Sequence, residues 1–234
     1  MINNISVIIP FYNQVQLTYN LLLNIIENTY LPTQIIVIDN GSTEKVKLIT
    51  RFTGLNINYV RNDTNTGVNA AWNLGIKLVD KECKLVSILN NDITISGFFF
   101  EKINYTFNLD PLIGIAVPHS HPYPDIARKT VFSPTAIVDI DKREGWAFTI
   151  RKEVIDKIPP IPSDLKIFYG DDYLFHLTKV LGYKRVKMVD NYIFHKLSTT
   201  LRSLWRKDQE KSIQHEERVI WFKLKEEIDE GNYK

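Results

Sequence analysis

The stretch Ile5-Ser6-Val7-Ile8-Ile9-Pro10 decides the fold. Its first five residues are almost wholly apolar and mostly β-branched, and a proline ends the run, which predicts a short strand buried on both faces. The run Ile35-Ile36-Val37-Ile38 has the same character. Between the two runs, apolar residues recur at helical spacing from Val15 to Asn28. These three segments predict a β-α-β unit of a parallel sheet.

Two further units follow the first. A weaker helix over 43–51 leads to a strand over 57–60, and a helix over 68–79 leads to a strand over 85–89. This rhythm predicts an α/β fold with a single doubly wound, mostly parallel sheet flanked by helices, which binds ligands beyond the carboxyl ends of its strands. The polar residues that follow each strand are therefore the candidates for a site.

The second half of the chain is less regular. Residues 118–135 contain four prolines and two histidines, which predicts a loop over the sheet that acts as a mobile lid. A helix is expected over 172–181 and strands over 186–189 and 192–194, followed by a charged amphipathic helix from Leu201.

Composition excludes several classes of protein. The 234 residues suffice for one main domain, and 44% hydrophobic with 24% charged residues is typical of a folded protein. A net charge of +2 creates no general field for nucleic acid, so no nucleic-acid partner is expected. The single cysteine, Cys83, excludes an intramolecular disulfide framework. No transmembrane span or signal peptide is recognisable, so we expect a cytoplasmic protein.

The segment 201–234 is expected to be an amphipathic helical extension. It holds eight Lys or Arg and eight Asp or Glu, so it does not look like a polybasic membrane anchor. Its apolar residues could pack on the domain or form a homodimer through the helix; they are Trp205, Ile213, Ile220, Trp221 and Leu224.

Polar residues follow two of the predicted strands. Asp39-Asn40-Gly41-Ser42 is a good turn and helix-start sequence, but Asp39 directly follows a buried run, where its carboxylate can contact a ligand. Asn90-Asn91-Asp92 can be a tight turn or a hard-cation site in which Asp92 supplies the carboxylate.

Two more candidates lie in the second half. Asp171 and Asp172 either cap the start of a helix or form a general-base pair, because a neighbouring negative charge raises one carboxyl pKa. His195 ends a strand and is either structural or a metal ligand. It could ligate a metal if its strand lies beside the fourth predicted strand, over 85–89, and Lys196 would then contact phosphate.

These residues together resemble the nucleotide-sugar half of glycosyltransferase family 2. The resemblance covers about Ile5 to Thr200 and is sharpest before Ile95. It is carried by Pro10-Phe11-Tyr12-Asn13, Ile36-Val37-Ile38-Asp39-Asn40-Gly41-Ser42, Asn65-Thr66-Gly67, Asn73-Leu74-Gly75 and Leu89-Asn90-Asn91-Asp92.

The resemblance implies a GT-A fold over residues 1–200, with a nucleotide-sugar half at about 1–95 and an acceptor half at about 96–200. It implies an inverting glycosyltransferase that moves a sugar from a nucleoside diphosphate sugar to a hydroxyl of a glycan or another acceptor. Mn²⁺ or Mg²⁺ would be the cofactor. If a membrane carries the acceptor, the enzyme would lie at its surface.

The same resemblance assigns roles to residues. Asp92 and His195 would hold the cation, although Asn90 replaces the first acid of the family's Asp-x-Asp and removes one charge. Asp39 would bind the base of the nucleotide. The full set of residues expected to bind the donor nucleotide is Pro10, Tyr12, Asn13, Asp39, Asn65, Gly67, Asn73, Asn90 and Asn91.

The acceptor side is expected to include Gly145 and Trp146, whose ring would stack on a sugar, with a buried core Trp as the alternative. Asp171 and Asp172 look like the family's catalytic acidic pair, with Asp172 as the general base. No Gly-x-Gly-x-x-Gly follows Ile9, which argues against a dinucleotide-dependent oxidoreductase. A catalytically silent nucleotide- or carbohydrate-binding module on the same fold remains the alternative.

Overall fold

The computed structural model describes residues 4–28, 30–43, 52, 54–122, 135–141, 145–196 and 207–232. Most of the helix predicted over 43–51 lies outside the described residues. So does most of the loop predicted over 118–135, and with it the expected lid.

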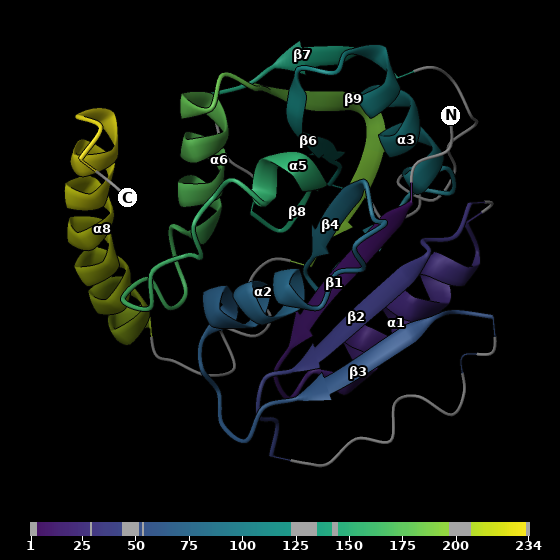
Figure 1. Ribbon diagram of the computed structural model, residues 1–234. Coiled ribbons are helices and arrows are strands. Elements are labelled where there is room, and N and C mark those ends of the chain that lie inside the picture. Colours follow the sequence, from purple (N-terminus) through teal and green to yellow (C-terminus); the bar gives the residue numbers. More distant parts are fainter. Residues whose placement is uncertain are drawn as a thin grey trace.

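A nine-stranded sheet forms the centre of the molecule (Figure 1), in the order β3-β2-β1-β4-β8-β6-β9-β5, with β7 also paired to β9. The strands are β1 Ile5–Phe11, β2 Gln34–Asp39, β3 Ile57–Arg61, β4 Leu85–Leu89, β5 Ile93–Ile95, β6 Ile113–Ser120, β7 Ile137–Asp139, β8 Ala147–Arg151 and β9 Lys184–His195. The helices are α1 Val15–Ile26, α2 Val68–Lys77, α3 Phe99–Leu109, α5 Lys152–Ile155, α6 Gly170–Val180 and α8 Lys207–Asp229.

The parallel half of the sheet is the one predicted. Strands β3, β2, β1 and β4 are all parallel, and every residue of β1, β2 and β4 is buried. The rest is mixed: β6 and β9 are parallel, but β8, β5 and β7 run antiparallel to their neighbours. The prediction of a mostly parallel sheet therefore holds only for part of it. The two strands expected over 186–189 and 192–194 are one strand, β9, whose register against β6 shifts once between them.

Helices cover both faces of the sheet because successive residues of the buried strands point to opposite sides. Val7 and Ile9 of β1 pack in one apolar cluster with α1 and α3. Ile8 packs in a second cluster with α2, α5 and α6, to which α8 adds Trp221. Both faces are thus buried, as parallel strands require. Figure 1 shows α8 lying alongside α6 at one end of the molecule.

The predicted C-terminal helix is present from Lys207 as α8, while residues 201–206, with Trp205, lie outside the described residues. Its apolar residues Trp221, Leu224 and Ile228 are buried against the domain. Within the described residues, no helix is both long enough and apolar enough to cross a membrane.

Candidate active site

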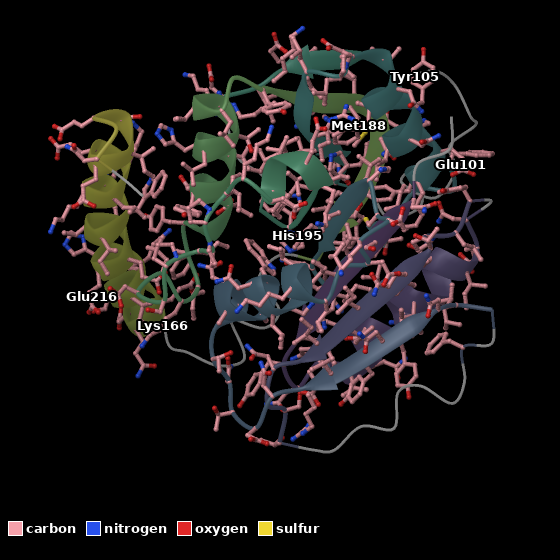
Figure 2. All side chains as sticks on the ribbon, in the orientation of Figure 1. Glu101, Tyr105, Lys166, Met188, His195 and Glu216 are labelled. Carbon is pink, nitrogen blue, oxygen red and sulfur yellow. The ribbon has the colours of Figure 1, made fainter. Side chains whose placement is uncertain are left out.

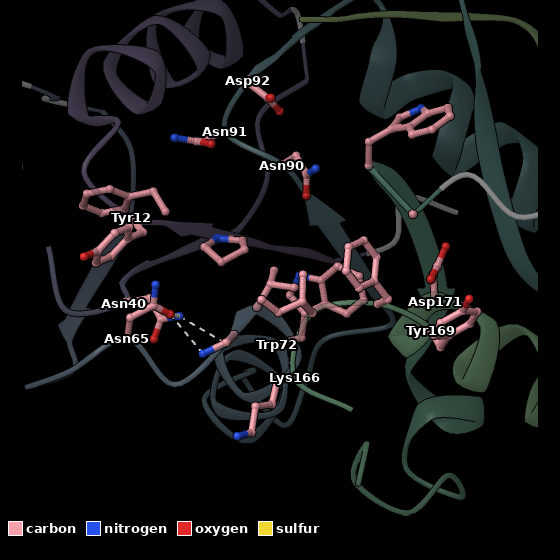
Figure 3. Close-up of a pocket in the computed structure, with 18 of the residues that line it drawn as sticks. Tyr12, Asn40, Asn65, Trp72, Asn90, Asn91, Asp92, Lys166, Tyr169 and Asp171 are labelled. Atoms are coloured by element: carbon pink, nitrogen blue, oxygen red, sulfur yellow. Dashed lines mark hydrogen bonds between the residues drawn. The ribbon is translucent and has the colours of Figure 1, made fainter. Parts of the chain in front are cut away.

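A cavity of about 790 Å³ opens where β1, β2 and β4 end (Figure 3). This is the edge at which a doubly wound sheet binds ligands. Most residues that the sequence nominated lie on its wall: Pro10, Tyr12, Asn65, Gly67, Asn90, Asn91, Asp92, Gly145, Trp146, Asp171, Asp172 and His195. Asn13, Asp39 and Asn73 are not on the wall.

Antiparallel pairing brings distant segments to the turn that follows β4. The backbone N–H of Asn90 donates to the carbonyl of Trp146, at 2.8 Å, just before β8 begins. After the turn, β5 pairs with the end of β9, and the Lys196 N–H donates to the Asp92 carbonyl at 2.9 Å. As a result Asp92, Trp146 and His195 surround one point, although they are far apart in sequence.

Asp92 and His195 form a buried pair on the cavity wall. The Nε2 atom of His195 lies 3.2 Å from Oδ1 of Asp92, and their side chains are 8% and 6% exposed respectively. Neither ring nitrogen of His195 has a hydrogen-bond partner within the part of the chain that the structure describes. A buried imidazole without such a bond, beside a carboxylate oxygen, fits a divalent cation that both would ligate.

The rest of the coordination shell would have to come from elsewhere. Among the described residues no group of three or more His, Cys, Asp or Glu side chains is placed to hold a metal ion. Cations that carry substrate phosphates are commonly held by one or two protein ligands, with phosphate oxygens and water completing the shell. The pair of Asp92 and His195 is of this kind.

Trp146 belongs both to the core and to the cavity wall. Its ring stacks on the His195 ring, with centroids 5.1 Å apart and planes 22° apart, and it packs on the cluster of α1 and α3. A place in the core therefore does not exclude a place on the cavity wall for this tryptophan. The stacking contact holds the imidazole plane nearly parallel to the indole ring.

The acidic pair of Asp171 and Asp172 lies at the start of α6, on the cavity wall. Asp171 and Asp172 are in the first turn of α6, and Asp172 is buried. Tyr169, directly before the helix, has a left-handed backbone with φ of 60°. In Figure 3, Asp171 and Tyr169 lie across the cavity from Tyr12.

Gly145 makes room for the acidic pair. A Cβ atom built on Gly145 would lie 2.5 Å from Oδ2 of Asp171 and 2.8 Å from its Cγ. The predicted acceptor-side role of Gly145 is not tested by this contact, but the absence of a side chain there is what allows the carboxylate to occupy its position.

Asn40, which the sequence presented as a turn residue, organises the nucleotide side. Its side-chain amide donates to Oδ1 of Asn65 and to the carbonyl of Gly67, both at 3.0 Å. Its carbonyl oxygen accepts from the Thr66 hydroxyl at 2.9 Å. Gly67 has φ of 88°, and a Cβ there would lie 2.5 Å from the carbonyl of Lys166. The loop 65–67 is thus held between β2 and the segment before α6.

The Asp39 carboxylate is buried in a network of its own. Its Oδ1 accepts from the Ser42 N–H at 2.8 Å, and its Oδ2 accepts from the Tyr59 hydroxyl at 2.9 Å and pairs with Arg61. Burial, together with the hydrogen bond to Asp39, raises the pKa of Tyr59 to about 12. The role of Asp39 in binding the base stays a prediction.

Three other nominated amides bond to neighbouring segments. Oδ1 of Asn13 accepts from the Thr43 N–H at 2.8 Å. The Asn73 amide is bonded to both backbone groups of Ile161, at 2.8 and 3.0 Å. Asn91 is on the cavity wall, yet its amide nitrogen donates to α1 and the residue before it. These contacts position loops around the cavity.

Sequence reasoning missed the segment 166–169 and Gln214, which also line the cavity. The segment directly precedes the acidic pair, which was the only signal for it. Gln214 lies on α8, and nothing in its surrounding sequence marks it as a site residue.

Comparison with known proteins identifies the family and the fold of the chain. The model of the family described as glycosyl transferase family 2 matches residues 6–130. A search of curated proteins found no match. Solved structures resemble the chain more broadly, and three of them are described next.

GalNAc-T7 with UDP, GalNAc and Mn²⁺ is 18% identical, with a TM-score of 0.69 over 83% of this chain and 44% of that one. The mannosyltransferase PcManGT from Pyrobaculum calidifontis, in complex with GDP-Man and Mn²⁺, is 16% identical, with a TM-score of 0.66 over 86% of this chain and 59% of that one. TarS from S. aureus is 15% identical, with a TM-score of 0.64 over 83% of this chain and 37% of that one.

The chain thus spans less than two thirds of these proteins, and the likeness at such identities concerns the fold. It confirms the GT-A fold expected from the sequence. With the family match covering more than half of its residues, the chain belongs to glycosyl transferase family 2.

Proposed function

We propose that this protein transfers a sugar from a nucleoside diphosphate sugar to a hydroxyl group of a glycan or another acceptor, with inversion at the anomeric carbon. One observation carries the proposal: a buried carboxylate–imidazole pair, 3.2 Å apart, shares a single cavity with the acidic pair at the start of α6. Glycosyl transfer from a diphosphate needs both groups, one at the leaving group and one at the attacking hydroxyl.

The charges on the wall explain why a cation would be needed. Asp92, Asp171 and Asp172 are negative, and Lys166 is the one Lys or Arg side chain among the described lining residues. A diphosphate would be repelled by this surplus of negative charge. A bound divalent cation would supply positive charge where the leaving diphosphate becomes more negative. Asp92 and His195 are the residues that would hold it, and Mn²⁺ is present in two of the similar structures.

Asp172 is proposed as the general base. In a single displacement the base must stand on the face of the sugar opposite the diphosphate. Its neighbour Asp171, in the same first turn of α6, lies across the cavity from Tyr12 in Figure 3, which supports this role. The carboxylate would accept the proton of the acceptor hydroxyl as the new bond forms, a contribution of roughly 100-fold to 10,000-fold. Asp171 and the stacked Trp146 would help to position the acceptor.

The donor side is proposed to include Tyr12 with the end of β1 that precedes it. It also includes the loop 65–67, which Asn40 holds in place. Tyr12 presents an aromatic ring to the cavity, on which a nucleobase can stack. UDP and GDP are the nucleotides in the similar structures, and both belong in a first screen.

The test is a screen of UDP, GDP and dTDP sugars with Mn²⁺. A ligand that binds only the folded state raises the melting temperature, and slow hydrolysis of the same donor reports turnover. Asp172→Asn should leave the donor-induced melting shift intact and remove transfer. Equal loss of binding and transfer would refute its role as base. Donor binding without turnover under any condition would identify a silent binding module.

A further inference from the structure

A carboxylate from α8 holds the backbone of the segment that precedes the acidic pair. Oε2 of Glu217 accepts from the Phe168 N–H at 2.8 Å and from the Ile167 N–H at 3.1 Å. Glu217 is only 4% exposed. Packing of α8 on the domain does not require a buried carboxylate that accepts hydrogen bonds from two backbone amides of a cavity-lining segment.

The same segment is held from its other side by α2. The Asn69 amide nitrogen donates to the carbonyls of Leu165 and Phe168, at 3.0 and 3.1 Å, and the Asn69 N–H donates to the Lys166 carbonyl at 3.1 Å. Asn69 therefore donates hydrogen bonds to carbonyl groups of the segment, while Glu217 accepts hydrogen bonds from its N–H groups. The segment 165–168 is fixed between two helices that are far apart in sequence.

The segment 165–168 leads directly to the acidic pair. It continues through Tyr169, which has a left-handed backbone, into Gly170, Asp171 and Asp172 of α6. Gly170 is packed closely against α2, since a Cβ on Gly170 would lie 2.1 Å from Oδ1 of Asn69. A shift of the segment would therefore move Asp171 and Asp172. Figure 2 shows Lys166 beside the part of α8 that carries Glu216.

We infer that Glu217 is a positioning residue of the active site, and that α8 fixes the acidic pair against the donor side through it. The inference rests on the proposed function for its catalytic consequence. Gln214, one turn before Glu217 on the same helix, lines the cavity itself, so α8 contributes to the wall as well as to its alignment.

The first experiment is amide hydrogen exchange on the full chain without any ligand. The Ile167 and Phe168 amides should be protected in the unaltered protein and lose protection in Glu217→Ala. Glu217→Gln should retain part of it, because a carbonyl oxygen at the Oε2 position can still accept both bonds, while the 3.3 Å bond from the Ile167 N–H to Oε1 is lost to the NH₂ group. Glu216→Ala is the matched control: its carboxylate is exposed and accepts from the hydroxyl of Ser212 on the same helix, at 3.2 Å.

The second experiment measures kinetics with the donor identified by the screen. Glu217→Ala should lower kcat by roughly tenfold to a hundredfold, the effect expected for misplacing a catalytic group by up to 1 Å. The affinity for the Mn²⁺–nucleotide complex should change less than threefold, within about 0.65 kcal/mol. Glu217→Gln should recover most of kcat, and Glu216→Ala should behave as the unaltered protein.

Retained kcat in a Glu217→Ala protein that has lost amide protection would overturn the inference. So would unprotected Ile167 and Phe168 amides in the unaltered protein. If Glu217→Ala does not fold, a Glu217→Gln variant with unchanged exchange but a kcat as low as that of Asp172→Asn would also overturn it. Absence of turnover in the unaltered chain refutes the proposed function instead, because the exchange measurement needs no donor.

Discussion

Replacing Gly145 by alanine should separate activity from stability. The new Cβ would lie 2.5 Å from Oδ2 of Asp171, whereas carbon and oxygen atoms in ordinary contact are about 3.5 Å apart. The carboxylate would therefore have to move by about 1 Å. A displacement of that size in a residue that positions the substrate costs roughly a hundredfold in rate. We expect transfer by Gly145→Ala to fall by tenfold to a hundredfold, within that rough bound.

The same substitution should cost little stability. The atoms that must yield belong mainly to the end of an aspartate side chain facing a cavity, so the cost should be about 1 kcal/mol, at the low end for overpacking. For a chain of this length that is a fall in melting temperature of roughly 2–4 °C. Differential scanning fluorimetry with and without Mn²⁺ and the donor gives both the stability and the donor-induced shift, which should persist.

Gly114→Ala is the matched control, since it adds the same methyl group far from the cavity. Its Cβ would lie 2.6 Å from Cβ of Tyr183 and 2.7 Å from Cγ2 of Thr178, inside the core. It should lower the melting temperature more than Gly145→Ala and leave the rate per folded molecule unchanged. Full activity in Gly145→Ala would show that the position of Asp171 does not matter for the reaction, and the reasoning would fail.

Further predictions concern stability and titration. Trp221→Ala should destabilise the fold by about 3–5 kcal/mol, because the ring is fully buried, and lower the melting temperature by roughly 6–20 °C in calorimetry; a smaller change would mean that α8 packs loosely. Burial lowers the pKa of His176 below 6.5, although its 2.7 Å contact with Asp229 opposes this, so the stability it contributes is present above pH 6.5 and lost as pH falls through the lowered pKa. His176→Gln should flatten the acid limb of a plot of melting temperature against pH, and an unchanged limb would contradict this. The pKa of Tyr59 is raised to about 12, so its stabilisation is complete below pH 10 and is lost between pH 10 and 12. Tyr59→Phe should remove one phenolate transition near pH 12 from an alkaline absorbance titration, and a titration curve unchanged by the substitution would refute the assignment.

The N-terminal half of the fold could be predicted closely because its signals are local. Strand β4 has the bounds expected from its apolar run, and α1 begins where its helical spacing begins. In a parallel sheet with both faces covered, buried strands are continuous apolar runs, and each is followed along the chain by its own helix. Such patterns can be recognised without knowing which strands are neighbours.

The second half could not be predicted in the same way. Strand β8 inserts between β4 and β6, and β5 pairs with the far end of β9. The pairings of β8 with β4 and of β5 with β9 join segments separated by more than fifty residues, and no local pattern announces them. The nearness of Asp92 and His195 depends on the pairing of β5 with β9, so the sequence could nominate both residues but not the distance between them.

The partners of the side-chain amides could not be predicted from the sequence either. Asn40 and Asn73 both belong to motifs of the family and both bond to a neighbouring loop, yet only Asn40 of the two lines the cavity. An amide donates and accepts equally well to a ligand or to a neighbouring loop. Only the loop's position decides between the two, and that position is set by contacts such as those of Glu217 from a helix at the other end of the chain.

The most direct test is pulsed electron paramagnetic resonance on Mn²⁺ bound to the protein with its nucleoside diphosphate. If the buried pair ligates the ion, the spectrum will contain coupling to an imidazole nitrogen, and His195→Ala will abolish it while Lys196→Ala will not. Nucleotide-bound Mn²⁺ without nitrogen coupling in the unaltered protein would contradict the account.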